Sequence, residues 1–282
     1  AMLNRWCGWL AVTGLLCACS SVPLRTIDDR ERAAADLALE RGQRLFLHDR
    51  LAWVASDIYQ EALRRAGVAP PESVVWAIRD ELDGAHMVSF IIDLEHGGGY
   101  VDAEVYFLPD ADPDACLRRG LEDPKLCEGI DIARGVRPVR VEEQRWVEAR
   151  KAMLSDPRLR VCTSVPPNFT LLPEGERLIG YVLSASNDPQ RLIAAGHSRF
   201  ELSSDGTQVL DFLPLFRRCS VLQAEQSELP AALLVSGTRG LFDESHVFLQ
   251  LDLQRPVQVR DHRGRLIQIE DGDDGLRWRR LE

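Results

Sequence analysis

The chain has 282 residues and a formal net charge of −10, with 34 Lys and Arg against 44 Asp and Glu. This acidity argues against nucleic acid and against an anionic lipid surface as partners, because both repel negative charge. A basic protein partner is compatible with it. The 28% charged and 45% hydrophobic residues are typical of a globular protein.

The first residues show the three zones of a bacterial export signal. Arg5 supplies the positive charge, and the uncharged stretch 6–16 is too short to span a bilayer core of about 30 Å as a helix. The sequence Leu16-Cys17-Ala18-Cys19 then resembles a lipobox. We therefore expect residues 1–18 to be a lipoprotein signal peptide and Cys19 to carry lipid (palmitate and related chains), which anchors the mature chain to a membrane.

The residues after Cys19 predict where the mature chain is held. Ser20 and Ser21 resemble the residues at this place in lipoproteins of the outer membrane. We therefore expect the protein in the cell envelope, at the outer membrane and facing the periplasm. Residues 19–29 predict a short tether between the lipid and the folded part.

Two helical patterns follow the tether. Residues 30–46 are rich in Ala, Leu, Arg and Glu, and a second pattern places Leu51, Ala55 and Ile58 on one face before it stops at Gly67. The two pieces are compatible with one bent helix. Prolines 70 and 71 then break the pattern, because proline cannot continue a helix.

A β-meander is predicted next, over residues 74–79, 87–92 and 101–107, which are separated by turn-like segments. In the third stretch apolar residues alternate with Asp102, Glu104 and Tyr106, so one face of the sheet is expected to be solvated. Glu142–Leu154 predicts a helix with an acidic start and basic residues near its end, as the helix dipole favours.

The rest of the chain predicts mostly strands. They cover residues 178–183, 197–202, 209–213, 232–235, 246–253, 257–259, 266–269 and 276–281. The order of elements predicts an α+β fold, with N-terminal helices and a β-meander followed by a mostly antiparallel, β-rich C-terminal half. We expect regions 30–157 and 158–282, either as two domains or as one continuous domain.

Four cysteines remain beyond Cys19: Cys116, Cys127, Cys162 and Cys219. In the oxidising compartment outside the cytoplasm an even number favours disulfides, although four cysteines allow three pairings. We predict that Cys116 pairs with Cys127, closing a short loop, and that Cys162 pairs with Cys219, joining two strand ends. No CxxC spacing indicates a zinc site, and no motif indicates a cofactor.

Two histidines on predicted strands are candidate binding residues. Strand alternation places His197 with Arg199, and also places His246, on the more polar faces. If the strands are neighbours, these three side chains form a patch suited to an anionic group or a metal ion. The alternative is that each imidazole only makes a hydrogen bond at a strand end.

A second candidate lies on the predicted helix, where Asp49, Trp53 and Asp57 are spaced at i, i+4 and i+8, with His48 beside them. Two carboxylates and an aromatic ring on one face resemble a sugar-cleaving site. The alternative is a solvated helix edge whose Trp packs on the sheet.

Several short stretches are similar, in their order, to one protein family. They are Leu45–Trp53 with Ser56-Asp57, Gly196–Phe200 followed by Asp205-Gly206, Phe216–Cys219, and Ser245–Phe248. In these stretches the chain resembles a family of uncharacterised envelope lipoproteins from high-GC Gram-negative bacteria. The resemblance implies a location in the envelope but no reaction. It also implies that His48, Asp49, His197 and His246 belong together.

These features lead us to expect a lipoprotein with a non-catalytic binding or structural role, whose partners are the membrane and envelope proteins or peptidoglycan. One alternative is a periplasmic immunity or inhibitor protein that neutralises a basic lytic toxin. Another is a cell-wall hydrolase that uses the His and Asp residues named above. A deep cleft that holds those residues together would favour the hydrolase.

Overall fold

The computed structural model describes residues 26–93, 99–120, 123–186, 191–223, 230–237 and 239–281. The predicted signal peptide, the predicted lipidation site Cys19 and residues 19–25 of the predicted tether lie outside the described residues. No helix within the described ranges is both long and apolar enough to cross a bilayer.

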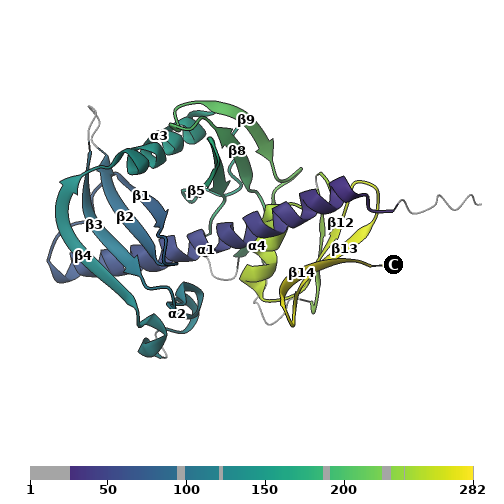
Figure 1. Cartoon of the computed structure of the whole chain (residues 1–282), viewed down its shortest axis with the longest axis horizontal. Helices are drawn as coiled ribbons and strands as arrows, with labels where there is room; N and C mark the ends of the chain where they lie inside the picture. Colours follow the sequence, from purple (N-terminus) through teal and green to yellow (C-terminus); the bar gives the residue numbers. More distant parts are fainter. Residues whose placement is uncertain are drawn as a thin grey trace, which may run out of the picture.

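A single helix, α1 (Asp29–Arg65), runs through the molecule (Figure 1). The Asp28 side chain accepts a hydrogen bond from the Glu31 backbone N–H, and the Glu31 side chain returns one, so the first turn is capped. The helix ends before Gly67, whose φ of +67° suits glycine. The two predicted helical pieces are therefore one helix. Its 37 residues span about 55 Å.

The first sheet is the predicted meander with one more strand. It consists of β1 (Val74–Asp80), β2 (His86–Asp93), β3 (Gly99–Phe107) and β4 (Ile130–Pro138), antiparallel in that order. The second half of α1 packs on it, with the Tyr59 and Phe90 rings stacked 4.3 Å apart. Between β3 and β4 lie α2 (Pro113–Arg119) and η1 (Pro124–Cys127), joined by the Cys116–Cys127 disulfide.

Helix α3 (Val141–Ser155) connects the first sheet to the second and packs against β1 and β6. The second sheet contains β5 (Asn168–Glu174), β6 (Arg177–Leu183), β8 (Ser198–Leu202) and β9 (Val209–Pro214) in antiparallel order. Two short strands, β7 (Arg191–Ala195) and β10 (Ser220–Gln223), pair separately. The Cys162–Cys219 disulfide joins the start and the end of this region, so both predicted disulfide pairings are confirmed.

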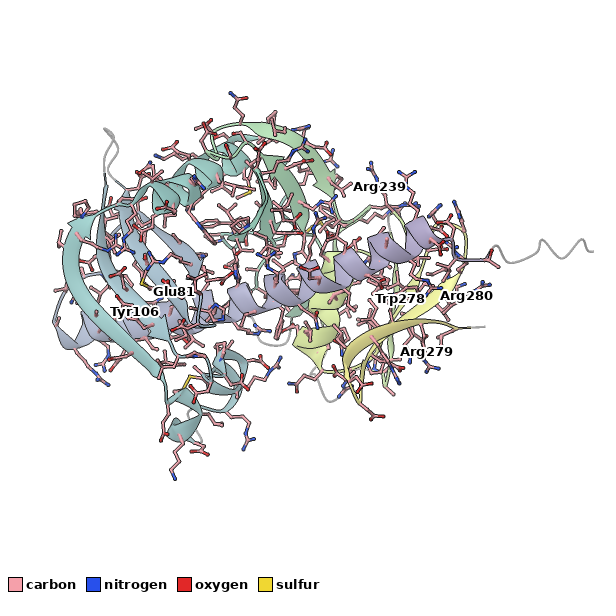
Figure 2. All side chains as sticks on the ribbon, viewed as in Figure 1. Glu81, Tyr106, Arg239, Trp278, Arg279 and Arg280 are labelled. Carbon is pink, nitrogen blue, oxygen red and sulfur yellow. A yellow bond between two sulfur atoms is a disulfide. The ribbon has the colours of Figure 1, made fainter. Side chains whose placement is uncertain are left out.

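The third sheet contains β11 (Leu233–Ser236), β12 (Val257–Arg260), β13 (Leu266–Gly272) and β14 (Gly275–Leu281). Strands β11 and β12 are parallel, and helix α4 (Glu244–Leu253) connects them. The predicted strand over residues 246–253 is therefore wrong. Figure 2 shows Trp278 of β14 beside α1, where its indole N–H donates to Asp36 at 2.8 Å.

Three hydrophobic clusters form the interior, and α1 contributes to each of them. Leu51 and its neighbours join the first cluster, Ala35 and Ala38 the second, and Leu45 the third. The first cluster contains side chains from both sides of position 158, among them Trp146 and Phe169. The α+β class, with a mostly antiparallel and β-rich C-terminal half, is confirmed.

Candidate functional site

The predicted site residues lie in three places along α1 and α4. His48 contacts the first and second sheets, Asp49 belongs to a buried ion cluster, and His197 lies with His246 at the start of α4. His48 and Asp49 are consecutive residues of α1 whose partners differ, so the four residues do not share one cleft.

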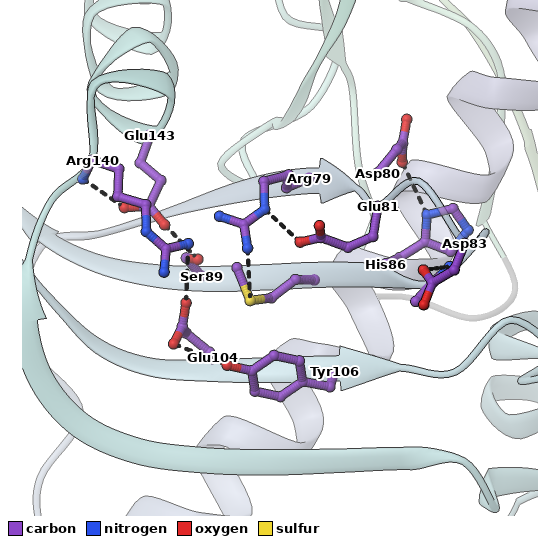
Figure 3. A network of polar contacts seen from close by, with 12 residues as sticks. Arg79, Asp80, Glu81, Asp83, His86, Ser89, Glu104, Tyr106, Arg140 and Glu143 are labelled. Carbon is purple, nitrogen blue, oxygen red and sulfur yellow. Dashed lines mark hydrogen bonds and ion pairs between the residues drawn. The ribbon is translucent and has the colours of Figure 1, made fainter.

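His48 is the centre of a buried polar contact between α1 and the two sheets. Its Nε2 lies 3.3 Å from Asp80 Oδ1, and its Nδ1 lies 3.4 Å from Thr170 Oγ1. Asp80 Oδ1 also lies 2.9 Å from His86 Nδ1 (Figure 3). The hydrogen bond with His48, followed by that with His86, holds the pKa of Asp80 well below its usual range. Sequence analysis missed Asp80 and His86, which only the fold brings to His48.

A cavity of about 280 Å³ lies beside His48, and Asp80 and Trp146 also line it. The hydroxyl that His48 contacts belongs to Thr170, which is 2% exposed and does not line this cavity. A hydroxyl nucleophile must reach its substrate. This arrangement therefore joins α1, β1 and β5 and does not present a nucleophile to the cavity.

A second polar network continues along the same sheet (Figure 3). Ser89 donates to Glu143 at 2.8 Å, Tyr106 donates to Glu104 at 3.1 Å, and Arg137 pairs with both glutamates. Glu143 also accepts from the Arg140 backbone N–H at the start of α3. The network fixes α3 to β2, β3 and β4.

Asp49 lies in a buried cluster centred on Arg50. The Arg50 guanidinium contacts Asp49 at 3.3 Å, Asp114 of α2 at 3.1 Å, and Asp252 of α4. Burial raises the pKa of Asp49 to about 6, against the opposing effects of Arg50 and of hydrogen bonds from Asn168 and Trp53. These contacts make Asp49 part of the packing of α1, α2 and α4.

The spacing of Asp49 and Asp57 on one helical face predicted a paired-carboxylate site. The structure places Asp57 in an exposed groove of about 850 Å³ beside the Cys116–Cys127 disulfide, which Asp49 does not line. Trp53 is half-exposed and donates to Asp49. The two carboxylates therefore do not flank a common substrate position, as sugar cleavage requires.

His197 and His246 do lie together, but not on neighbouring strands. His197 precedes β8, and His246 is in the first turn of α4; both are buried. The Phe248 ring contacts that of His197 edge-on, with centroids 5.9 Å apart, and also contacts Phe46. Arg199 is not part of this pair, because it donates to Glu244 at 2.7 Å. The predicted patch of two strand histidines with Arg199 is corrected accordingly.

The two imidazoles have different surroundings. Burial lowers the pKa of His197 to about 4, with the charge of Asp243 opposing this effect. Burial also disfavours the charged form of His246, but the charge of Asp243 and their hydrogen bond outweigh it, so the pKa of His246 is raised. The His246 Nδ1 lies 3.0 Å from Asp243 Oδ1. For both histidines, desolvation lowers the pKa and the Asp243 carboxylate raises it. Desolvation has the larger effect on His197, and the carboxylate with its hydrogen bond has the larger effect on His246.

Ser245, His246 and Asp243 are the residue types of a catalytic triad, but their contacts have a different order. Ser245 Oγ donates to Asp243 Oδ1 at 2.5 Å, and the same oxygen contacts His246 Nδ1. The imidazole also bonds the backbone of Ser236. In a triad the imidazole lies between hydroxyl and carboxylate. Here the carboxylate lies between them, so His246 cannot deprotonate Ser245.

A cavity of about 600 Å³ opens beside His246. It lies between the β7–β10 pair, β11, the end of β12 and the first turn of α4. Three arginines that sequence analysis did not select as site residues line it, namely Arg217, Arg218 and Arg260. The pattern Phe216–Cys219 had marked two of them only as part of a family resemblance.

Comparisons of this chain with protein-family models, with curated proteins and with solved structures give no match. Within the described part of the chain, no group of three or more His, Cys, Asp or Glu side chains is placed to hold a metal ion.

Proposed function

We propose that the protein is a lipoprotein of the cell envelope, anchored through Cys19, with a non-catalytic binding role. The single observation that carries the binding role is the 600 Å³ cavity beside His246. Its volume is in the range of small-molecule sites, about 300–1,000 Å³. Ser245 and His246 line it, and their contacts with the Asp243 carboxylate behind them have the order of a helix cap, not of a catalytic triad.

Export is supported by the cysteines. All four that follow Cys19 are paired, as Cys116–Cys127 and Cys162–Cys219. Disulfides persist in oxidising compartments such as the periplasm and are rare in the cytoplasm. Together with the lipobox and the serines after it, this favours attachment to the outer membrane, facing the periplasm.

Lipid attachment is tested with two cysteine variants of the full chain, produced in a Gram-negative host with labelled palmitate. Cys19→Ala is expected to lose the label and to change the processing of the signal peptide, because Cys19 is the acceptor. Cys17→Ala, two residues away, is the matched control and is expected to keep the label. Equal labelling of Cys19→Ala and the parent chain would reject the anchor.

The non-catalytic nature of the proposed role is tested separately, by measuring hydrolysis of purified cell wall. The protein is incubated with peptidoglycan, and soluble sugar and peptide fragments are measured over time. A binding protein releases none, and its His246→Ala variant behaves like the parent chain. Fragment release that His246→Ala or His48→Ala abolishes, with folding unchanged, would establish the cell-wall hydrolase instead.

A further inference from the structure

We propose that the cavity beside His246 binds an amphiphilic anion, a molecule with one alkyl chain and a carboxylate or phosphate head. This inference rests on the proposed binding role and names the class of ligand. It comes from the unequal distribution of charged and apolar side chains on the cavity wall.

The charged side chains on the wall are all of one kind. Arg217, Arg218 and Arg260 line the cavity, and no Asp or Glu among the described residues does so. The chain as a whole carries ten more acidic than basic residues. A cavity whose charged lining, within the described part of the chain, is entirely basic is therefore a local exception, and it attracts anions.

These arginines also have free hydrogen-bonding capacity. Elsewhere on this chain exposed arginines pair with carboxylates, as Arg64 does with Glu61 at 2.7 Å. Within the described ranges, Arg217, Arg218 and Arg260 form no ion pair. A guanidinium offers donors in a planar fork that matches a carboxylate or phosphate. Ser220 and Ser236, also on the wall, add hydroxyl groups.

Asp243 lies close to the cavity but does not cancel this charge. Its Oδ1 accepts from the Ser245 backbone and side chain and contacts His246 Nδ1. It does not line the cavity, whereas Ser245 and His246 do. The Asp243 carboxylate thus has hydrogen-bond partners within the protein, and two of these partners, Ser245 and His246, line the cavity in its place.

The same cavity also has an apolar lining. Leu215, Phe216, Leu222, Leu233 and Val235 form it. Small inorganic anions form no favourable contact with such a surface, whereas an alkyl chain is stabilised by each methylene group that it buries there. A cavity lined by both basic and apolar side chains therefore matches a ligand with a charged head and an apolar body.

The test uses the full chain in phosphatidylcholine vesicles and a palmitic acid that carries a photoreactive group on its alkyl chain. Labelled residues are located by mass spectrometry. The acid is expected to label residues of the cavity wall, and the matched alcohol, which lacks the negative charge, about tenfold less. An excess of lysophosphatidylglycerol or of free laurate as competitor distinguishes a phosphate head from a carboxylate head.

Charge reversal provides the matched variants. Arg217→Glu, Arg218→Glu and Arg260→Glu are each expected to reduce cavity labelling by about tenfold. Lys125→Glu makes the same change of charge on η1, beside the first sheet, and is expected to leave labelling unchanged. The three arginines are exposed, so folding is retained, which the thermal unfolding midpoint checks. Equal labelling by acid and alcohol, or an equal loss in Lys125→Glu, would overturn the proposal.

The same preparations separate this inference from the proposed anchor. The intact mass reports lipid on Cys19 independently of photolabelling. A lipidated protein that does not label in the cavity would overturn the ligand alone. A protein that labels in the cavity but carries no lipid would overturn the anchor alone.

Discussion

Gly42 of α1 lies directly against Val247 of α4. A methyl group at position 42 would lie 2.4 Å from the Val247 Cβ and 3.0 Å from the Glu244 carbonyl oxygen. Glycine is unfavourable within a helix by about 1 kcal/mol relative to alanine. Gly42 allows α1 and α4 to approach closely. This contact accounts for a glycine within α1, at the point where the sequence predicts a boundary between two helical pieces.

Gly42→Ala is therefore expected to destabilise the protein by about 1–3 kcal/mol, although the same change in an exposed helix is stabilising. Chemical denaturation of Gly42→Ala, Val247→Ala and the double variant measures the contact. The double variant is expected to be more stable than the sum of the single changes by about 1 kcal/mol, because Val247→Ala removes the Cγ1 that would lie 2.6 Å from the methyl group and so relieves part of the clash. Strict additivity would show that the two residues do not touch.

Arg50→Met is expected to lower the free energy of unfolding by about 3–5 kcal/mol, because it leaves Asp49 and its acidic neighbours without their buried partner. Arg65→Met on the same helix removes the exposed pair with Glu61 and is the control, with an expected loss much smaller than that of Arg50→Met because solvent screens the exposed pair. Urea unfolding of both variants compares them. Similar losses would mean that the Arg50 cluster does not hold α2 and α4 on α1.

Stability should also depend on pH through Asp49, whose pKa burial raises to about 6. The folded chain binds this proton more tightly than the unfolded chain, in which the pKa is about 4. The resulting stability is complete below about pH 4 and is lost as the pH rises through 6. Relative to Asp49→Asn, the parent chain is expected to lose up to about 3 kcal/mol between pH 4 and 7.

Asp205 is the control for this titration, because its pKa is shifted in the opposite direction. Hydrogen bonds, chiefly from Ser203 and Thr207, lower the pKa of exposed Asp205 to about 2. Its contribution is present above about pH 4 and is lost as the pH falls toward 2. Asp205→Asn should therefore reduce the acid sensitivity of the chain, whereas Asp49→Asn reduces the loss at neutral pH. Unfolding curves from pH 3 to 7 separate the two; parallel curves for Asp49→Asn and the parent chain would contradict the assignment.

The two disulfides should contribute unequally. Cys162–Cys219 separates its cysteines by 57 positions and Cys116–Cys127 by 11. By the loop-closure relation these crosslinks stabilise by roughly 4 and roughly 3 kcal/mol, because the longer loop loses more freedom in the unfolded chain. Thermal unfolding of Cys162→Ser/Cys219→Ser and Cys116→Ser/Cys127→Ser tests the order. A larger loss in the second variant would show that native packing, and not loop length, sets the effect.

Among the strands that the sequence predicted correctly, β3 shows the alternation of a half-solvated strand most clearly. β3 alternates buried Val101, Ala103 and Val105 with side chains that are less buried, and this period identified it. Helix α4 lacks a solvated face, because Val247, Leu249, Gln250 and Leu253 are all buried between α1 and the third sheet. Its regular alternation of apolar residues was therefore taken for a strand. The N-cap Asp243 was the signal that could have identified the helix.

Strand β4 was missed for the opposite reason. It lies at the edge of the first sheet and is largely exposed, and the alternation that Ile130 and Ile132 begin is interrupted at Arg134. The candidate site was predictable only in part. His197 and His246 do meet, but Asp80, which pairs with His48, and the cavity arginines come from segments whose proximity depends on the whole fold.

The course of α1 has a consequence for how the chain folds. Its first turns are synthesised early, yet the other buried members of the cluster that contains Ala35 and Ala38 all lie between Leu241 and Ile269, and the Trp278 indole N–H donates to Asp36. These contacts are far apart in sequence, which slows folding. The start of the helix therefore remains without its apolar partners until nearly the whole chain has emerged.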